Sequence, residues 1–479
     1  YAKIPYEVLR KGQKKVFEVE KTVKLHVNTA FYSTKTDFHH KLTGFHTQAK
    51  DTLHKFVSQN KKLSNMKHLN IKNLLLAGSV FISMQLYADN NVFNSIVAQD
   101  GTGSFATIQD AIDAAPDSSA TPYIIFIKAG HYHEHLYIPA SKPNLHLVGQ
   151  SRRLVRVSDD RVSGGPNASP VDVAATMVVH ATDTYLEEIT FENSWGTRKK
   201  DGPQALALYT KMDRNVVNRC AMLSYQDTYR TANALNWRNY VKDCFIEGAI
   251  DFLYGQGNVF FDHCTLNITR KQGGWIVAPK HDEGTTWGYV LKNTTITAPG
   301  NPKDTEIWLG RPWLHSPKAV FIDTKAEVTI PDEGWYDHMG TLPAVFADYN
   351  TTDASGRKLD LSKRIDRYYK LTAEKDTIWG KAKNMLTDKE AKLYTVDNVL
   401  SGDDNWNPLI LCKTLKSPVV KCEQGIITWK PIQGARGYVV CKGDKVVEIT
   451  TDTKYAVDGK PSLYTVQSVS KTGSLSIIK

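Results

Sequence analysis

Cysteine is scarce in this chain, and no two cysteines form a CxxC pair. The chain contains six cysteines: Cys220, Cys244, Cys264, Cys412, Cys422 and Cys441. Cysteines this few and this widely spaced exclude a small disulfide-stapled fold and argue against a zinc site. We therefore expect a large hydrophobic core to hold the fold and expect no bound metal.

Long apolar runs are also lacking. No stretch reaches the roughly 18 apolar residues that a membrane-spanning helix needs, so we predict no membrane span. The longest apolar stretch, NLLLAGSVFISMQL (73–86), follows the basic segment MKHLNIK (66–72) and ends near the small residue Ala88. This order is typical of a secretory signal, with cleavage before Asp89. A buried amphipathic helix is the alternative interpretation of residues 66–88.

An excess of positive charge is missing from most of the chain, although the net charge is +10. Within the segment 1–65, Lys and Arg outnumber Asp and Glu by 13 to 5, and the segment 66–88 adds only Lys67 and Lys72. The chain from Asp89 onward is therefore neutral, and we predict no nucleic-acid partner. We expect residues 1–65 to be an upstream extension with little structure.

Residues 93–348 carry many short apolar runs separated by Asn, Asp and Gly, with one plausible helix at IQDAIDAAP (108–116). The triplets NRC, KDC and DHC end at Cys220, Cys244 and Cys264 and each precedes a short apolar run. The similar spacings between these cysteines suit the coils of a parallel β-helix. The three cysteines would form a buried stack, with a Cys220–Cys244 disulfide as the alternative. The predicted class is all-β.

The same repeat places polar residues in register. Asp227 follows Cys220 by seven positions, and Asp251 follows Cys244 by seven. Adjacent parallel strands lie about 4.8 Å apart, so the two aspartates should stack on neighbouring coils. Gln204 precedes Asp227 by about the length of one coil, which predicts a column of Gln, Asp and Asp. A polar column of this kind is either structural or catalytic, and spacing alone leaves both open.

The remaining sequence divides into two parts. Residues 349–408 are polar, and we expect them to pack back along the β-helix. The segment 387–400 is predicted to be helical. Residues 409–479 alternate between apolar and polar positions, with frequent turns, which predicts a small antiparallel sandwich. This sandwich resembles a fibronectin type III module with Trp429 and Tyr438 in its core. We expect this module to be a passive spacer, with sugar binding as the alternative. The predicted domains are the β-helix at residues 89–408 and the sandwich at residues 409–479.

Five short motifs resemble the signature blocks of pectin methylesterases and occur in that family's order. They are GHYHE (130–134), QALAL (204–208), QDTY (226–229), DFLYG (251–255) and LGRPW (309–313). The resemblance extends over about residues 93–408. It implies a right-handed parallel β-helix that hydrolyses the methyl esters of polygalacturonate in pectin. Tyr229 and Tyr254 depart from the family, which often has Leu and Phe there.

The resemblance also implies roles for residues. Asp251 would be the nucleophile, Asp227 the general acid and base, and Arg311 the group that keeps Asp251 ionised. Gln204 and Gln226 would donate hydrogen bonds to the oxyanion. No metal and no cofactor would take part.

Three aromatic residues complete the expected site, since Trp313, Tyr229 and Tyr254 would line the sugar groove. Tyr132 and Glu134 we interpret as structural, and the histidines 131, 133 and 135 as surface residues. The protein would be a secreted monomer from a bacterium.

Two other functions remain open at this stage. A calcium-dependent pectate lyase would need clustered acidic ligands and a basic residue that abstracts a proton. A non-catalytic, pectin-binding β-helix would need neither aspartate.

Overall fold

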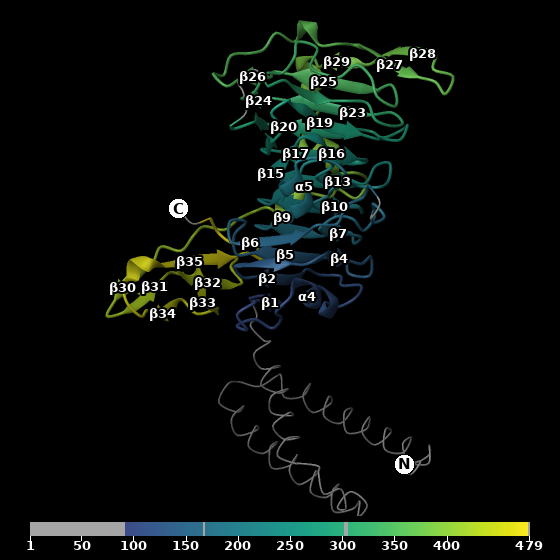
Figure 1. Ribbon diagram of the computed structural model, residues 1–479. Helices are drawn as coiled ribbons and strands as arrows, with labels where there is room; N and C mark the ends of the chain where they lie inside the picture. The colour runs from purple at the N-terminus through teal and green to yellow at the C-terminus, as the bar shows by residue number, and fades with distance from the viewer. Residues whose placement is uncertain (1–91, 166–167, 301–304, 478–479) are drawn as a thin grey trace, which may run out of the picture. The chain divides into compact units, whose positions relative to one another are not determined.

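The computed structural model describes residues 92–165, 168–300 and 305–477, which all belong to the compact unit Ser83–Lys479. The predicted extension (1–65) and signal segment (66–88) lie outside the described residues. Figure 1 shows parallel strands stacked coil upon coil, with small antiparallel sheets formed by the C-terminal residues. The prediction of a mostly β, parallel β-helix fold is confirmed. No helix among the described residues is long and apolar enough to cross a membrane.

Three parallel sheets form the walls of the β-helix, and the coils from β2 to β22 contribute one strand to each wall. The first sheet has eleven strands, in the order β1 (Ser95–Val97), β2 (Tyr123–Ile127), β5 (Leu145–Gly149), β8 (Tyr185–Glu187), β11 (Asn215–Asn218), β14 (Arg238–Lys242), β17 (Asn258–Asp262), β20 (Tyr289–Lys292), β23 (Lys318–Ile322), β25 (Val345–Tyr349) and β29 (Lys383–Met385).

The second sheet has nine strands, in the order β26 (Thr352–Asp353), β24 (Lys325–Ala326), β21 (Thr295–Thr297), β18 (Thr265–Ile268), β15 (Phe245–Gly248), β12 (Ala221–Leu223), β9 (Thr190–Asn193), β6 (Val155–Asp159) and β3 (Gly130–His133). The third sheet has seven, in the order β22 (Ile307–Gly310), β19 (Gly274–Pro279), β16 (Ile250–Gly255), β13 (Tyr229–Thr231), β10 (Leu208–Thr210), β7 (Met177–Val179) and β4 (Leu136–Ile138). We call this third wall the active-site sheet.

The turn from the first sheet to the second explains the cysteine repeat. A residue in the left-handed conformation follows each strand from β8 to β25 there, for example Asp243 (φ 52°) and His263 (φ 54°). The next residue points inward, and this is where Cys220, Cys244 and Cys264 lie, all at most 2% exposed. All three are free thiols, so the buried stack is confirmed and the alternative Cys220–Cys244 disulfide is not formed.

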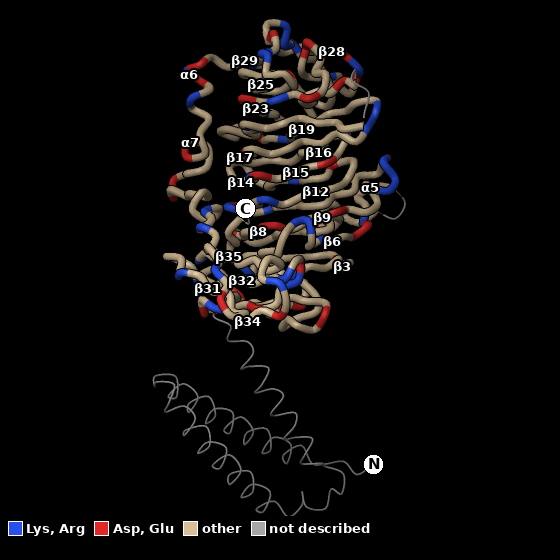
Figure 2. The backbone as a smooth tube through the Cα atoms, turned by 90° about the vertical axis from the view of Figure 1, so that its left-hand side faces the viewer, with Lys and Arg blue, Asp and Glu red and all other residues tan. Residues whose placement is uncertain are grey.

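Apolar side chains from all three sheets fill the interior of the β-helix. The largest fully buried ones are aromatic and include Tyr229, Tyr289 and Trp335. Phe261 contacts both tyrosines edge to face, with ring centroids 6.2 and 5.7 Å apart. Figure 2 shows basic and acidic residues interspersed among uncharged residues along the chain. Burial of this continuous core is the main stabilising contribution.

Short helices cover the ends and one side. The predicted N-terminal helix is α4 (Ile108–Ala114), and the Glu134 carboxylate accepts hydrogen bonds from the backbone N–H groups of Ile108 and Gln109. Glu134 is therefore structural, as expected. The other helices are α5 (Ser194–Lys199), α6 (Asp388–Ala391), α7 (Val396–Leu400) and the 3₁₀ turns η1 (Leu361–Lys363), η2 (Pro408–Ile410) and η3 (Pro461–Leu463). The helices α6 and α7 confirm the helix predicted within residues 387–400.

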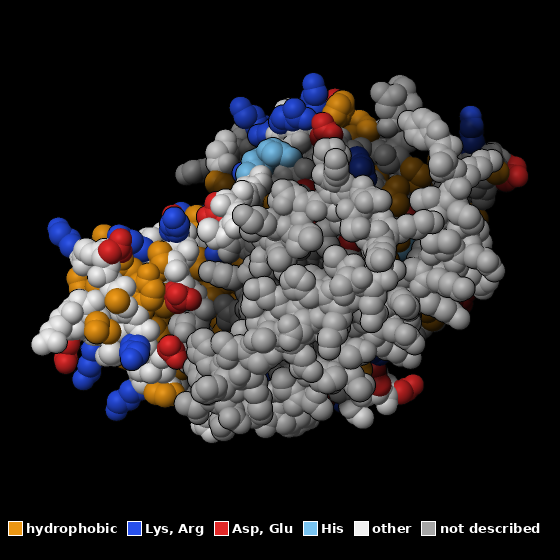
Figure 3. Space-filling view, turned by 90° about the horizontal axis from the view of Figure 1, so that it is seen from below, with side chains coloured by type: hydrophobic (Ala, Val, Ile, Leu, Met, Phe, Trp, Pro, Cys, Tyr) orange, Lys and Arg blue, Asp and Glu red, His pale blue; other side chains and the backbone are white. Residues whose placement is uncertain are grey.

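The C-terminal residues form two antiparallel sheets of three strands, as predicted. One sheet contains β30 (Lys421–Glu423), β31 (Ile426–Thr428) and β34 (Lys454–Ala456), and the other contains β33 (Lys445–Thr450), β32 (Gly437–Lys442) and β35 (Tyr464–Val469). Trp429 and Tyr438 lie in their shared core, with ring centroids 5.3 Å apart. Figure 3 shows hydrophobic and charged side chains mixed on this module, at the left of the view. The expected likeness of this module to fibronectin type III stays a prediction.

This C-terminal module packs on the β-helix, because it shares a hydrophobic cluster with the outer face of the first sheet. Val439, Val469 and Leu475 pack in the same cluster as Ile124 and Val148. Polar contacts add to this, since the Ser474 hydroxyl donates to the buried Glu187 carboxylate at 2.9 Å. The module is thus part of the packed β-helix unit.

Candidate active site

Asp227 and Asp251 occupy equivalent positions on neighbouring coils of the active-site sheet. The register pairs Gln226 with Ile250 on one side of the aspartates and Tyr229 with Leu253 on the other. The Asp227 N–H also donates to the Ile250 carbonyl at 3.1 Å. The predicted stacking of the two aspartates on adjacent coils is therefore present in the fold.

Both aspartates adopt a backbone conformation that most residues avoid. Asp227 has φ 59° and Asp251 has φ 49°, both in the left-handed region. The pairing of β16 with β19 shifts register between Ile250 and Leu253, so an extra residue is accommodated beside Asp251. Bulges of this kind redirect side chains next to active sites. Phe252 and Leu253 both enter the core, whereas the Asp251 carboxylate pairs with the half-buried Arg311 of a later coil.

Arg311 holds Asp251 in a two-point contact. Its Nε donates to Asp251 Oδ1 at 2.8 Å and its Nη2 to Oδ2 at 2.6 Å. The guanidinium also lies over the ring of Trp275, 4.1 Å from the ring centroid. A planar guanidinium gripped in this way fixes the orientation of the carboxylate and favours its ionised form.

The two carboxyl groups differ in their electrostatic surroundings. Burial raises the pKa of Asp227 well above its usual range, and the negative charge of Asp251 raises it further. Burial also raises the pKa of Asp251, but Arg311 opposes that effect through hydrogen bonds and charge. Arg311 does not hold the pKa of Asp251 low, because burial outweighs it at a residue that is only 6% exposed. Asp227 remains the group that binds its proton more tightly.

The two glutamines lie on adjacent coils but one position out of register, since the Ala205 N–H donates to the Gln226 carbonyl at 3.1 Å. Leu208 of β10 pairs with Tyr229 of β13, which fixes the offset between these two coils. Counting back two positions from that pair makes Leu206, and not Gln204, equivalent to Asp227, so the predicted Gln–Asp–Asp column is wrong. Among the described residues, neither Gln204 nor Gln226 has a side-chain hydrogen bond, and both are half-buried. Their amides are thus available to a ligand.

Tyr229 does not line a groove, which corrects the prediction. It is fully buried, and its hydroxyl is 2.8 Å from the Thr210 hydroxyl in the interior. Side chains alternate along β13, so the inward position of Tyr229 leaves Arg230 as the outward residue. Tyr254 and Trp313 do lie on the outer face, with ring centroids 5.8 Å apart, although Tyr254 is only 3% exposed.

Sequence reasoning missed two residues that flank the aspartates. Arg230 lies 4.3 Å from the ring centroid of Tyr209, pairs with the Asp172 carboxylate at 3.2 Å, and contributes to the positive potential at Asp227. Its buried Nε has no hydrogen-bond partner among the described residues. Trp275 contacts Arg311. Strand alternation identifies both positions once the register is known, because Arg230 is paired with Tyr254 and Trp275 with Ile250.

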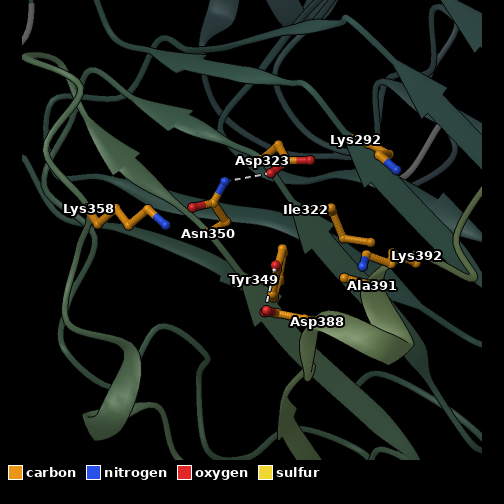
Figure 4. Close-up of a pocket in the computed structure, with 9 residues that line it drawn as sticks. All are labelled: Lys292, Ile322, Asp323, Tyr349, Asn350, Lys358, Asp388, Ala391 and Lys392. Atoms are coloured by element: carbon orange, nitrogen blue, oxygen red, sulfur yellow. Dashed lines mark hydrogen bonds between the residues drawn. The ribbon is translucent and has the colours of Figure 1, made fainter.

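Two other polar clusters lie away from the aspartates. His131 and His133 flank the Ser158 hydroxyl at 2.9 and 3.0 Å on the second sheet. No group of three or more potential metal ligands occurs within the described residues. A pocket of about 310 Å³ opens beside the first sheet (Figure 4). It is lined by Lys292, Ile322, Asp323, Tyr349, Asn350, Lys358, Asp388, Ala391 and Lys392, and it contains neither Asp227 nor Asp251.

Solved structures define the class of the protein. A pectin methylesterase from carrot matches with a TM-score of 0.55 at 25% identity, over 65% of this chain and 94% of that chain. A pectin methylesterase from Erwinia chrysanthemi has the same fold, with a TM-score of 0.52 at 24% identity, over 66% of this chain and 98% of that chain. The chain is therefore a parallel β-helix of the kind found in pectin methylesterases.

Sequence comparison then identifies the family. The model of the Pectinesterase family matches residues 94–403, so this chain belongs to the pectinesterase family and is an esterase. It is 29% identical to a pectinesterase of Petunia integrifolia over 327 residues, which cover 65% of this chain and 81% of that protein. It is also 29% identical to pectinesterase/pectinesterase inhibitor 18 of Arabidopsis thaliana, of which it spans 53%. These relatives come from plants, so they give no support to the predicted bacterial source.

Proposed function

We propose that this protein removes methyl esters from pectin, with Asp251 as nucleophile and Asp227 as general acid and base. The observation that carries the proposal is the pairing of two buried carboxyl groups, of which only Asp251 is gripped by a guanidinium. Two such groups in different surroundings divide the roles of ionised and protonated carboxyl between them. Membership of the pectinesterase family supports the same reaction.

The first half of the reaction forms a covalent intermediate. The ionised Asp251 attacks the ester carbonyl carbon, and the carbonyl electrons move onto the oxygen. The half-buried amides of Gln204 and Gln226 donate hydrogen bonds to that oxygen. When the intermediate collapses, the bond to methoxide breaks and Asp227 supplies its proton, which releases methanol and leaves a mixed anhydride on Asp251.

The second half returns the enzyme to its starting state. Asp227, now ionised, accepts a proton from water as the oxygen attacks the substrate carbonyl of the anhydride. Cleavage of the anhydride regenerates the Asp251 carboxylate and leaves galacturonate. Trp313 and Tyr254, on the outer face, contact the sugar ring that carries the ester. We further propose that the protein acts outside the cell as a monomer.

One assay separates this proposal from the two alternatives. Highly methylated pectin is incubated with the protein, and methanol, unsaturated sugar and retention of protein on pectin are measured together. The esterase produces methanol and no double bond, a pectate lyase produces the double bond, and a binding protein gives retention alone. The matched control is Asp251→Asn, which keeps the side-chain shape and should release no methanol.

A further inference from the structure

A row of aromatic side chains leads away from the aspartates toward the C-terminal end of the active-site sheet. Trp275, which contacts Arg311, is 5.6 Å from Tyr336, and Tyr336 is 4.8 Å from His338. His338 stacks on Tyr369 at 4.4 Å with 19° between the ring planes, and Tyr369 is 5.0 Å from Trp379. We call Tyr336, His338, Tyr369 and Trp379 the hairpin row.

The last two members stand on an antiparallel hairpin beyond β22, the last strand of the active-site sheet. The hairpin consists of β27 (Arg367–Leu371) and β28 (Thr377–Lys381), and Figure 1 places it near the end of the β-helix at the top of the view. His338 pairs with Tyr369 in a parallel bridge, and the Tyr369 N–H donates to the Asp337 carbonyl at 3.0 Å. The Tyr336 N–H donates in turn to the Gly310 carbonyl of β22 at 3.0 Å, so backbone contacts connect the hairpin row to the wall that carries the aspartates.

The hairpin is anchored on one face and open on the other. Tyr368 is fully buried in the core of the β-helix and faces Gly380 across the hairpin. The cross-strand pair Tyr369 and Trp379 projects on the opposite face, and Trp379 is 50% exposed. An exposed tryptophan that stands on a rigidly anchored strand offers apolar area at little cost in conformational entropy.

The charges around the row balance. Arg367 lies over the Trp379 ring at 4.3 Å, and Lys381 pairs with the Asp366 carboxylate at 3.1 Å. Asp337, which pairs with His338 at 2.5 Å, offsets the remaining positive charge of Arg367. A surface that combines aromatic rings with no net charge suits an uncharged sugar better than an ionised one.

We propose that the hairpin row binds methyl-esterified galacturonate residues of the same pectin chain whose ester lies at Asp251. This inference rests on the proposed function, because continuity with the aspartates is what identifies the occupant. Galacturonate rings present apolar C–H faces that pack on aromatic side chains, and esterification removes the carboxylate charge. The row would therefore give the enzyme a preference for long, esterified substrates.

The test compares two neighbouring exposed residues that face opposite ways. Trp379→Ala removes the end of the row, whereas the control Ile378→Ala removes a 42% exposed side chain that pairs with Lys370 on the other face. KM and kcat are measured on methyl-esterified oligogalacturonides from short chains up to intact pectin. We expect Trp379→Ala to raise KM for long chains about three- to tenfold, with kcat and the KM for short chains unchanged. Ile378→Ala should match the wild type.

Three outcomes would overturn the inference: no difference between the two variants, an equal rise of KM for short and long chains, or a lower kcat without a change in KM. Direct calorimetric binding of pectin and of pectate gives a readout that does not depend on turnover. Wild-type protein should bind pectin more tightly than pectate, and Trp379→Ala should reduce that difference. A wild-type protein that releases no methanol would refute the proposed function, while the binding measurement would still decide the hairpin row.

Discussion

Replacing Arg311 with lysine tests whether a fixed, ionised Asp251 is the nucleophile. The guanidinium makes two charge-assisted hydrogen bonds to Asp251, at 2.8 and 2.6 Å, in a planar geometry that an ammonium group cannot reproduce. Loss of one hydrogen bond to a charged group costs about 1.5 to 3 kcal/mol. If that contact is made in the transition state, kcat/KM should fall by roughly 10- to 100-fold.

The pH dependence should move in a defined direction. Burial already raises the pKa of Asp251, and Arg311 is the group that opposes it. Arg311→Lys weakens that opposition, so the pKa of Asp251 rises further. Because the nucleophile must be ionised, the acidic limb of the profile of kcat/KM against pH should shift to higher pH. The basic limb, which reports deprotonation of Asp227, should move much less.

The assay is methanol release from methylated pectin across the pH range, next to a thermal unfolding control. Arg357→Lys is the matched control, because Arg357 pairs with Asp353 at 3.0 Å but is exposed and remote from the aspartates. It should leave rate and profile unchanged. The reasoning is refuted if Arg311→Lys folds normally, keeps its rate within about twofold and shows no shift of the acidic limb.

Three further predictions concern stability. Burial and Asp251 raise the pKa of Asp227, so the folded state loses stability as the pH rises above the ordinary carboxyl pKa. Asp227→Asn should therefore be more stable than wild type at neutral pH, by on the order of 1 kcal/mol in denaturant unfolding. This gain should vanish at acidic pH. A Cβ added at Gly473 (φ +93°) would lie 2.5 Å from the Ile124 side chain, whereas a Cβ added at Gly443 (φ +58°) would lie in open space. Gly473→Ala should therefore lower Tm clearly more than Gly443→Ala. Equal losses would show that the C-terminal module does not depend on this contact. Tyr229→Phe should cost about 1 to 3 kcal/mol of unfolding free energy without raising KM; a raised KM would return Tyr229 to the sugar groove.

The sequence predicted the coil repeat well because the same residue types recur at one point of each turn. A left-handed residue followed by a buried one ends the strands of the first sheet from β8 to β25, which is why Cys220 and Cys244 fixed the stacking of the aspartates. The coil that contains Gln204 has no such marker. Because Leu208 pairs with Tyr229, this coil is two residues shorter than the separation of Gln204 from Asp227. The prediction therefore placed Gln204 two positions from its true register.

The prediction for Tyr229 failed because packing, not spacing, decides the direction of its side chain. Tyr229 was assigned to the groove from its place in a motif, but alternation along a short strand turns it inward. The packing of the C-terminal module on the β-helix was also not predicted, because only the strands and turns within the module can be identified in the sequence. Its contact with the first sheet depends on apolar residues such as Val439 and Leu475, whose partners lie far earlier in the chain. Neither result has a local signal in the sequence.

The backbone at Asp251 explains why an aspartate suits this position in two ways. A regular strand would place Phe252 and Leu253 on opposite faces, yet both belong to the core, and the register shift beside them permits this. The shift requires a residue in the left-handed conformation, which costs most L-residues about 1 kcal/mol or more. Asp and Asn tolerate that conformation best among residues with a side chain. Asp251 therefore adopts the backbone conformation that the bulge requires. The same conformation turns its carboxylate outward, where it pairs with Arg311.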